Sequence, residues 1–309
     1  MIIPIFVSLG LIALIEATSY FVLLKKYNRT IPKVTLAIGK FGTTNGLNSN
    51  LITMVWGKKF TTDNFGSRPF QKANTKPKKV WIGDSVVEGL GVSDSMLFTK
   101  LLSSSDTAFE YLNFAHAGNT PLDYFNAISS LLGTNSILKK DTIHSFHIGI
   151  CLNDIYSDAK IKSTLPTILH QANEFFQISN TYRLAKLLFN RNSDGYFQHD
   201  AALYKNEEKV HILIDQLVNI SALCKSKNVP CQFYLFPYKS QFVSSNFAPQ
   251  QTLAYHMGIN GLSFVDLSSY LRKVDNPTAL YLFSDEIHFS ENGHEAIASI
   301  LERNKPFLP

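Results

Sequence analysis

The chain has 309 residues, enough for one large domain or for one domain with appendages. Its hydrophobic content of 45% and charged content of 17% are ordinary for a folded globular protein and argue against disorder. The net charge of +5 is modest and the lysines and arginines are scattered, so no nucleic-acid partner is expected. Three cysteines without C-x-x-C or His/Cys spacing exclude a disulfide framework and a zinc site, and leave one Cys224–Cys231 bridge open.

Residues 1–24 are apolar apart from Glu16 and a few hydroxyl residues, and three basic residues follow within 25–29. A run of this length can span a hydrocarbon core, and its uncharged start differs from that of a cleaved signal peptide. We therefore expect a transmembrane anchor at 1–24 and a single-pass membrane protein. A buried helix is the alternative, and Glu16 counts against a comfortable span. The basic residues after the run place the main domain in the cytoplasm by the positive-inside rule.

Residues 25–78 are mixed in character, with a short apolar patch at Leu51–Trp56 followed by turns rich in Gly and Asn. We expect a connector with a small accessory element here, and not a second domain.

After this segment, apolar runs of strand length alternate with longer helical patterns. Alternation of this kind predicts βαβ units, and hence an α/β domain over 79–309 with a parallel sheet covered on both faces. The expected strands are Lys79–Gly83, Glu110–Phe114, Ser145–Ile150, Gln232–Phe236 and Ser263–Leu267, and the expected helices include Tyr124–Leu132, Lys209–Lys225 and Asn292–Arg303.

The stretch 155–204 has no clear strand and reads as a helical insert. It carries two aromatic and aliphatic segments, Phe175–Ile178 and Tyr182–Phe189. Two interpretations stay open, a helical pair that packs on the sheet and a lid over the site.

Polar residues that could do chemistry follow the ends of these strands. In open parallel sheets the site lies beyond the carboxyl ends of the strands. Ser85 follows the first strand, where a helix N-terminus favours developing negative charge. By itself Gly-Asp-Ser is a common turn sequence, so Ser85 is a candidate nucleophile only if other residues are present that could activate it.

Asp285 and His288 lie three positions apart, just before the last helix. That spacing lets a carboxylate accept from one imidazole nitrogen while the other nitrogen faces outward. A serine nucleophile needs such a base, and the base needs an orienting group. Taken alone, the segment could also be a capping turn. We expect His294, further along, on the solvent side of the final helix.

Gly118 and Asn153 follow the second and third strands. An asparagine amide at a strand end can donate to an oxyanion, and a glycine lets a substrate approach its backbone N–H. Each is also an ordinary turn residue when considered alone.

Together the motifs resemble those of a known family. Four short blocks are similar, in the same order, to those of the SGNH or GDSL-type hydrolase superfamily: Gly83-Asp84-Ser85-x-x-x-Gly89, Gly118, Asn153-Asp154 and Asp285-x-x-His288. The resemblance covers residues 79–303. In the third block Gly149 stands further from Asn153 than is usual and has no assigned role. The segment Asp63–Arg68 looks similar to the lead-in of membrane-anchored members from bacterial surface-polysaccharide settings.

This resemblance implies a flavodoxin-like three-layer α/β/α domain. It implies Ser85 as nucleophile, His288 as base and Asp285 as its orienting group. The Ser85 and Gly118 N–H groups and the Asn153 side chain would donate to the oxyanion.

The resulting hypothesis is a serine esterase that cleaves O-acyl esters, acetyl esters in particular, of a carbohydrate or lipid, and that needs no cofactor. An O-acyltransferase with a sugar hydroxyl acceptor and a non-catalytic binding protein are the alternatives. The suspected glycan setting favours a catalytic domain outside the cytoplasm, against the charge rule.

Overall fold

The structure is a computed structural model that describes residues 2–25, 50–55, 58–64, 66–69, 75–134, 136, 138, 142–156, 179–189, 193–282 and 285–303.

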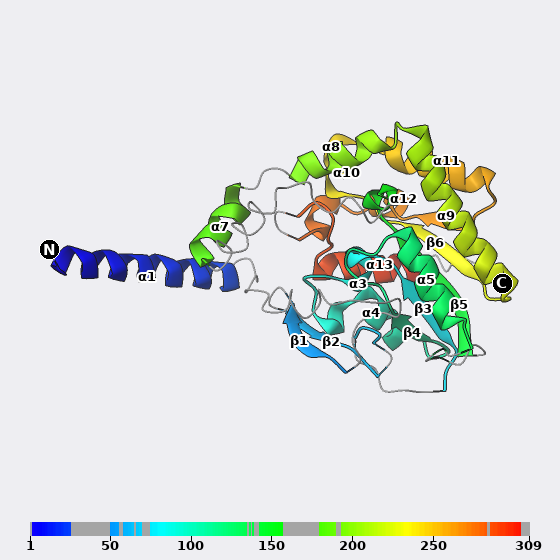
Figure 1. Cartoon of the computed structure of the whole chain (residues 1–309), viewed down its shortest axis with the longest axis horizontal. Coiled ribbons are helices and arrows are strands. Elements are labelled where there is room, and N and C mark those ends of the chain that lie inside the picture. The colour runs from blue at the N-terminus through cyan, green and yellow to red at the C-terminus, as the bar shows by residue number, and fades with distance from the viewer. Residues whose placement is uncertain are drawn as a thin grey trace.

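A five-stranded parallel sheet forms the centre of the molecule (Figure 1). The strands lie in the order β4-β3-β5-β6-β7, which is the 2-1-3-4-5 order of flavodoxin-like doubly wound sheets. The predicted three-layer α/β fold with a central parallel sheet is therefore confirmed. The strands are β3 (Lys78–Ile82), β4 (Glu110–Asn113), β5 (Ile143–Ile150), β6 (Cys231–Leu235) and β7 (Phe264–Asp266).

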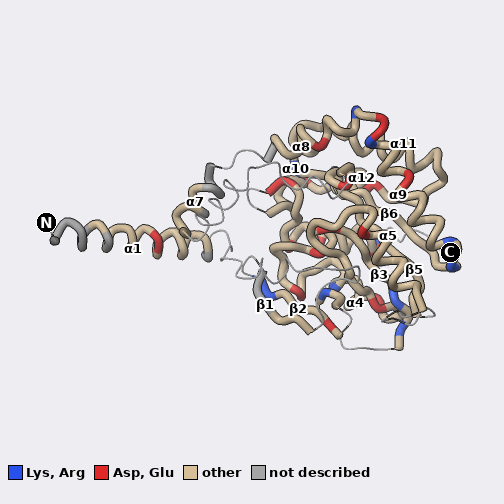
Figure 2. The backbone as a smooth tube through the Cα atoms, in the orientation of Figure 1, with Lys and Arg blue, Asp and Glu red and all other residues tan. Residues whose placement is uncertain are grey.

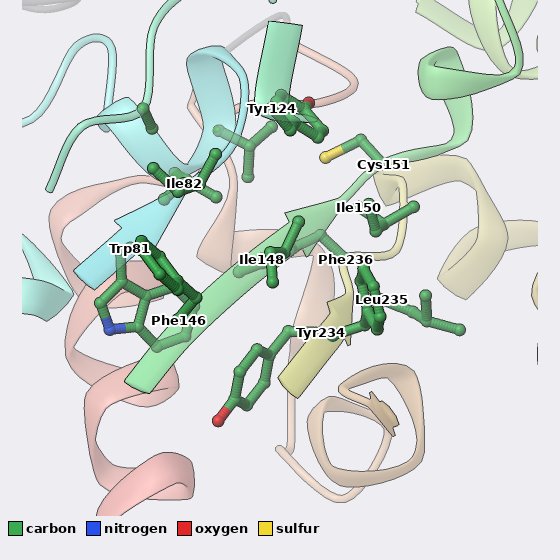
Figure 3. Close-up of a cluster of buried hydrophobic side chains, with 14 of the residues drawn as sticks. Trp81, Ile82, Tyr124, Phe146, Ile148, Ile150, Cys151, Tyr234, Leu235 and Phe236 are labelled. Atoms are coloured by element: carbon green, nitrogen blue, oxygen red, sulfur yellow. The ribbon is translucent and has the colours of Figure 1, made fainter. Parts of the chain in front are cut away.

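Successive side chains of a strand point to opposite faces of the sheet, and in β3, β5 and β6 both faces are buried. Trp81 stacks on His147 of the neighbouring strand and lies 4.7 Å from the ring of Tyr234, centroid to centroid. Ile82 and Ile148, one position further along each strand, are equally buried and point the other way (Figure 3). Burial on both faces explains why the ends of these strands, Val80–Ile82 in β3 and Phe233–Leu235 in β6, appear in the sequence as apolar runs.

Helices cover both faces. On the Trp81 face, the ring centroid of Phe98 in α4 lies 4.8 Å from that of Trp81 and 5.5 Å from that of His294 in α13. Helices α5 and α9 pack against each other on the opposite face (Figure 1). The main helices are α4 (Phe98–Ser105), α5 (Pro121–Leu131), α9 (Glu207–Ser226), α11 (Ala248–Ile259) and α13 (Glu291–Arg303). Shorter ones are α3 (Ser85–Glu88), α10 (Lys239–Ser244), α12 (Ser268–Leu271) and the 3-10 turns η1 (Asp94–Met96), η3 (Leu152–Ile155) and η4 (Pro277–Leu280).

The segment before the sheet forms a small antiparallel hairpin of β1 (Ile52–Val55) and β2 (Lys58–Thr61). The Lys58 ammonium lies 2.9 Å from the Glu291 carboxylate at the start of α13. The backbone N–H of Arg68 donates to the Asn113 carbonyl at the end of β4. The accessory segment is thus bonded to the sheet domain at both of these points.

The expected membrane anchor at residues 1–24 is wrong. Residues Ile2–Lys25 form a helix, α1, but no helix in the described part of the chain is long and apolar enough to cross a membrane. Polar groups interrupt the apolar run, and they are paired. The Glu16 carboxylate accepts from the Ser179 hydroxyl and from the Asn180 backbone N–H at 2.7 Å. The single-pass location with an extracytoplasmic domain rested on this anchor and is wrong as well.

Helix α7 (Asn180–Phe189) of the predicted insert lies beside α1 (Figure 1). Acidic charge within α1 is visible in Figure 2, where basic and acidic residues elsewhere are interspersed along the chain. Helix α8 (Ser193–Leu203) packs on the body through the buried Phe197. The segment Phe175–Ile178 lies outside the described residues.

Candidate active site

Ser85 is the first residue of α3, directly after the turn that ends β3. The Asp84 carboxylate caps this helix by accepting the Val86 N–H at 2.9 Å. The helix ends at Gly89, which has a left-handed φ of 79° and lies against Leu97, so a Cβ there would be only 2.2 Å from Leu97 Cδ2. The four-residue helix is therefore fixed at both ends, with the serine in its first turn.

Two glycines allow α3 to pack closely against the sheet. A Cβ on Gly83 would lie 2.5 Å from Val87 Cγ2, and one on Gly149 would lie 2.2 Å from the same atom. Such distances are well inside van der Waals contact, so only glycine fits at these positions. Gly149, which has no role in the motif resemblance, thus makes room on β5 for the helix that carries Ser85.

The structure brings Ser85, His288 and Asp285 into one hydrogen-bonded chain. The Ser85 Oγ lies 2.9 Å from His288 Nε2, although 203 positions separate the two residues. His288 Nδ1 lies 3.0 Å from Asp285 Oδ2. A carboxylate acceptor at Nδ1 places the imidazole proton there, which leaves Nε2 free to accept the serine proton. This is the arrangement of a nucleophile, a base and an orienting carboxylate.

The Asp285 carboxylate is held in its ionised form. Burial raises the pKa of Asp285, but the charge of His288 and the hydrogen bonds from His288 and Ile287 lower it more. The resulting pKa lies well below its ordinary value. Asp285 can therefore stabilise an imidazolium at His288 as it forms.

Glu286, between the two triad residues, anchors their loop to α10. Its backbone carbonyl accepts the Lys239 N–H at 2.9 Å, and its carboxylate accepts the Ser240 N–H at 2.6 Å. The side chain is buried. Sequence reasoning missed this residue, because its partners are about 46 positions away in the chain.

Asn153 lies in η3, after β5, and reaches toward the turn that precedes Ser85. Its Nδ2 donates to Asp84 Oδ2 at 3.2 Å. Burial raises the pKa of Asp84, against the lowering effect of its hydrogen bonds from Val86 and Asn153. Asp84 therefore does more than stabilise a turn, since it also orients the Asn153 amide.

A second buried carboxylate, Asp154 of the third motif block, holds the Asn153 turn. Asp154 Oδ2 accepts the Cys151 N–H at 2.8 Å, and its Oδ1 accepts the Tyr124 hydroxyl at 2.8 Å. Burial and the charge of Asp84 raise the pKa of Asp154 well above its ordinary value. Burial also raises the pKa of the Cys151 thiol, which disfavours the thiolate form.

Gly118 lies on the loop between β4 and α5, with a left-handed φ of 82° and open space where a Cβ would stand. The preceding residue, Ala117, donates its N–H to the Glu88 carboxylate of α3 at 3.0 Å. This contact binds the loop to the helix that carries Ser85. Within the described residues, the N–H groups of Gly118 and Ser85 donate to no protein acceptor.

His294 is not on the solvent side of α13, and that expectation is wrong. Its side chain is 1% exposed, and Nδ1 accepts the Phe98 N–H at 3.2 Å. Burial, followed by the nearby charge of Arg68, lowers the pKa of His294 to about 3. The residue belongs to the buried stripe of α13 with Ile297, Ala298 and Leu301, a helical spacing that the sequence contains.

No protein-family model matches this chain, and no curated protein does. Several solved structures resemble it. One is a member of the lipolytic protein G-D-S-L family from Veillonella parvula, with 15% identity, a TM-score of 0.44, and coverage of 73% of this chain and 96% of the other. Another is a lipase/acylhydrolase from Enterococcus faecalis, with 14% identity, a TM-score of 0.44, and coverage of 74% and 95%. A third is a catalytic mutant of the acetylxylan esterase Axe2 from Geobacillus stearothermophilus, with 16% identity, a TM-score of 0.45, and coverage of 77% and 97%. The low identities and TM-scores give these likenesses no weight as to function.

Proposed function

We propose that this protein is a serine esterase that cleaves O-acyl esters through an acyl-serine intermediate. The observation that carries the proposal is the 2.9 Å contact between Ser85 Oγ and His288 Nε2, with Asp285 on the other imidazole nitrogen. A serine hydroxyl is a weak nucleophile unless a base takes its proton, and this contact supplies the base.

In the first step, Ser85 Oγ attacks the ester carbonyl carbon and His288 takes the hydroxyl proton. The N–H groups of Ser85 and Gly118 and the Asn153 amide hold the resulting oxyanion. The bond to the alcohol then breaks, and the alcohol leaves with the proton from His288. Water attacks the acyl-serine with His288 again as base, which releases the carboxylic acid and restores the Ser85 hydroxyl.

The substrate class is part of the proposal. Acetyl esters of a carbohydrate or a lipid are the class that the motif resemblance implies.

Labelling by a fluorophosphonate probe and turnover of an activated acetyl ester test the proposal. Wild-type protein should label at Ser85. Ser85→Ala should not label, and Ser85→Ala and His288→Ala should each lose turnover by up to about 10⁶-fold, the scale seen when serine hydrolases lose these groups. Ser104→Ala, on the exposed side of α4, is the matched control and should behave as wild type. Absence of labelling in wild-type protein would refute the proposal and favour a non-catalytic binding protein.

The same assay with added glycans distinguishes the esterase from an O-acyltransferase, because the two differ only in the nucleophile that attacks the acyl-serine. If hydrolysis of the acetyl ester continues unchanged when glycans are added, the result supports the esterase. Transfer of the acetyl group to the glycan at the expense of hydrolysis would replace it by the transferase.

A further inference from the structure

Glu88, the last residue of α3, is a buried carboxylate that the proposed chemistry does not use. Its side chain is 0% exposed. One oxygen, Oε2, accepts the Ala117 N–H at 3.0 Å, and the other, Oε1, lies 3.4 Å from His116 Nδ1. A buried carboxylate is costly unless its oxygens are paired, so these contacts indicate a role for the group.

A buried guanidinium supplies the opposite charge. Arg68, from the accessory segment, is 1% exposed. Its Nη1 donates to the Glu88 carbonyl at 2.7 Å and to the Gly89 carbonyl at 2.8 Å, and its Nε lies 3.2 Å from Asp94 Oδ1. Burial lowers the pKa of Arg68, while the charges of Asp94 and Glu88 raise it, so the two carboxylates favour the charged guanidinium. Arg68 therefore fixes the end of the helix from which Glu88 projects.

The partner of Glu88 is the loop that carries Gly118. We call residues 116–119 the oxyanion loop. His116 donates its backbone N–H to the Gly83 carbonyl at 3.0 Å, just before Ser85 in the chain. The next N–H, that of Ala117, donates to Glu88, and the one after it, that of Gly118, donates to no acceptor among the described residues. No neighbouring atoms pack against Gly118 on the side where a Cβ would stand, so the loop has to be held by the residues beside it.

We propose that Glu88 is a positioning residue that fixes the oxyanion loop against α3 and thereby aims the Gly118 N–H at the position of the oxyanion. This inference rests on the proposed esterase function and adds to it a residue that touches neither the substrate nor the triad. It also makes the accessory segment, through Arg68, a support of the active site.

A donor aimed at the oxyanion stabilises the transition state more than the bound ester. Its misplacement therefore lowers kcat and leaves KM nearly unchanged. Loss of one such donor costs about 10²–10³-fold in kcat where it has been measured. A loop that loses its anchor should approach the lower end of that range.

The test compares three variants with wild-type protein in steady-state turnover of an activated acetyl ester. Glu88→Gln keeps an oxygen acceptor at the same reach and should retain kcat within about 10-fold, since one net hydrogen bond contributes about 1 kcal/mol. Glu88→Asp keeps the charge but is one methylene shorter, so it cannot reach the Ala117 N–H and should lose kcat by about 10²-fold. Glu88→Ala should lose at least as much, with KM changed by less than about threefold.

Glu110→Gln is the matched control. Glu110 is also buried, pairs with Lys78 at 3.0 Å, and lies at the start of β4, at the opposite end of the sheet from Ser85. This variant should change thermal stability and leave kcat unchanged. If Glu88→Ala fails to fold, the comparison of Glu88→Gln with Glu88→Asp decides.

Wild-type kcat in Glu88→Asp, or a Glu88→Asp variant more active than Glu88→Gln, would overturn the inference, because charge rather than reach would then matter. A rise in KM with unchanged kcat would also overturn it. If wild-type protein neither reacts with the fluorophosphonate probe nor hydrolyses the acetyl ester, the esterase proposal itself is refuted. The two failures are therefore distinguishable.

Discussion

The buried imidazole of His294 should make this protein lose stability in mild acid. Its pKa is about 3 in the folded chain, against an ordinary value of 6.5. Between those values the unfolded chain binds a proton at this residue and the folded chain does not. Stability therefore falls as the pH is lowered from 6.5 toward 3.

The size of the effect follows from the interval. Each pH unit below 6.5 costs about 1.4 kcal/mol of unfolding free energy, so one and a half units, to pH 5, cost about 2 kcal/mol. At pH 7.5 the cost is absent, because the imidazole is neutral in both states.

Urea unfolding of wild-type protein and of His294→Asn, at pH 7.5 and pH 5.0, measures this loss of unfolding free energy. An asparagine can place an oxygen near the position of Nδ1 and accept the Phe98 N–H, without a titrating group. The wild type should lose about 2 kcal/mol more than the variant between the two pH values, whatever the variant's absolute stability. His147 provides a second case, because burial also lowers its pKa to about 3. The His147→Gln variant should likewise lose less stability than wild type between pH 7.5 and pH 5.0. Equal pH dependence in wild type and His294→Asn would refute the reasoning.

Two further changes test the site and its packing. Asn153→Ala should lower kcat by about 10²-fold with little change in KM, because the amide acts on the developing oxyanion; an unchanged kcat would remove Asn153 from the oxyanion site. Gly149→Ala should lower unfolding stability by about 1–3 kcal/mol, because the added methyl would lie 2.2 Å from Val87 Cγ2. Gly258→Ala, at a helical position with open space, is the control in the thermal melts, and an equal effect of both changes would contradict the packing explanation.

The sheet was predictable because its central strands β3, β5 and β6 are buried on both faces. Their apolar residues, such as Val80–Ile82 in β3 and Ile148 and Ile150 in β5, form short runs that turns and helical patterns separate in the sequence. Ser85, Asp285 and His288 could be named because each follows a recognisable strand or precedes a helix start. Their contact could only be expected, since it depends on how the sheet brings the ends of β3 and the last loop together.

The supporting residues could not be found in this way. Glu88, Arg68 and Glu286 act through backbone groups far away in the chain, and no local pattern marks such partners. His294 was misplaced because it was considered as a polar residue, whereas its spacing in α13 puts it on the buried stripe. Residues 1–24 were misassigned because their apolar composition was taken as enough for a membrane span, although the run is not apolar enough and its Glu16 has partners near residue 180.

The buried guanidinium of Arg68 limits how the sheet domain can be separated from the rest of the chain. A fragment that began at β3 would contain every strand of the sheet and every triad residue. It would also leave three backbone carbonyls at and after the end of α3, and the Asp94 carboxylate, without the donor that now fills the space between them. Each buried acceptor left unpaired costs about 1–3 kcal/mol. The first element to loosen would be the helix that carries Ser85, so a shortened form of this protein has to start upstream of its sheet.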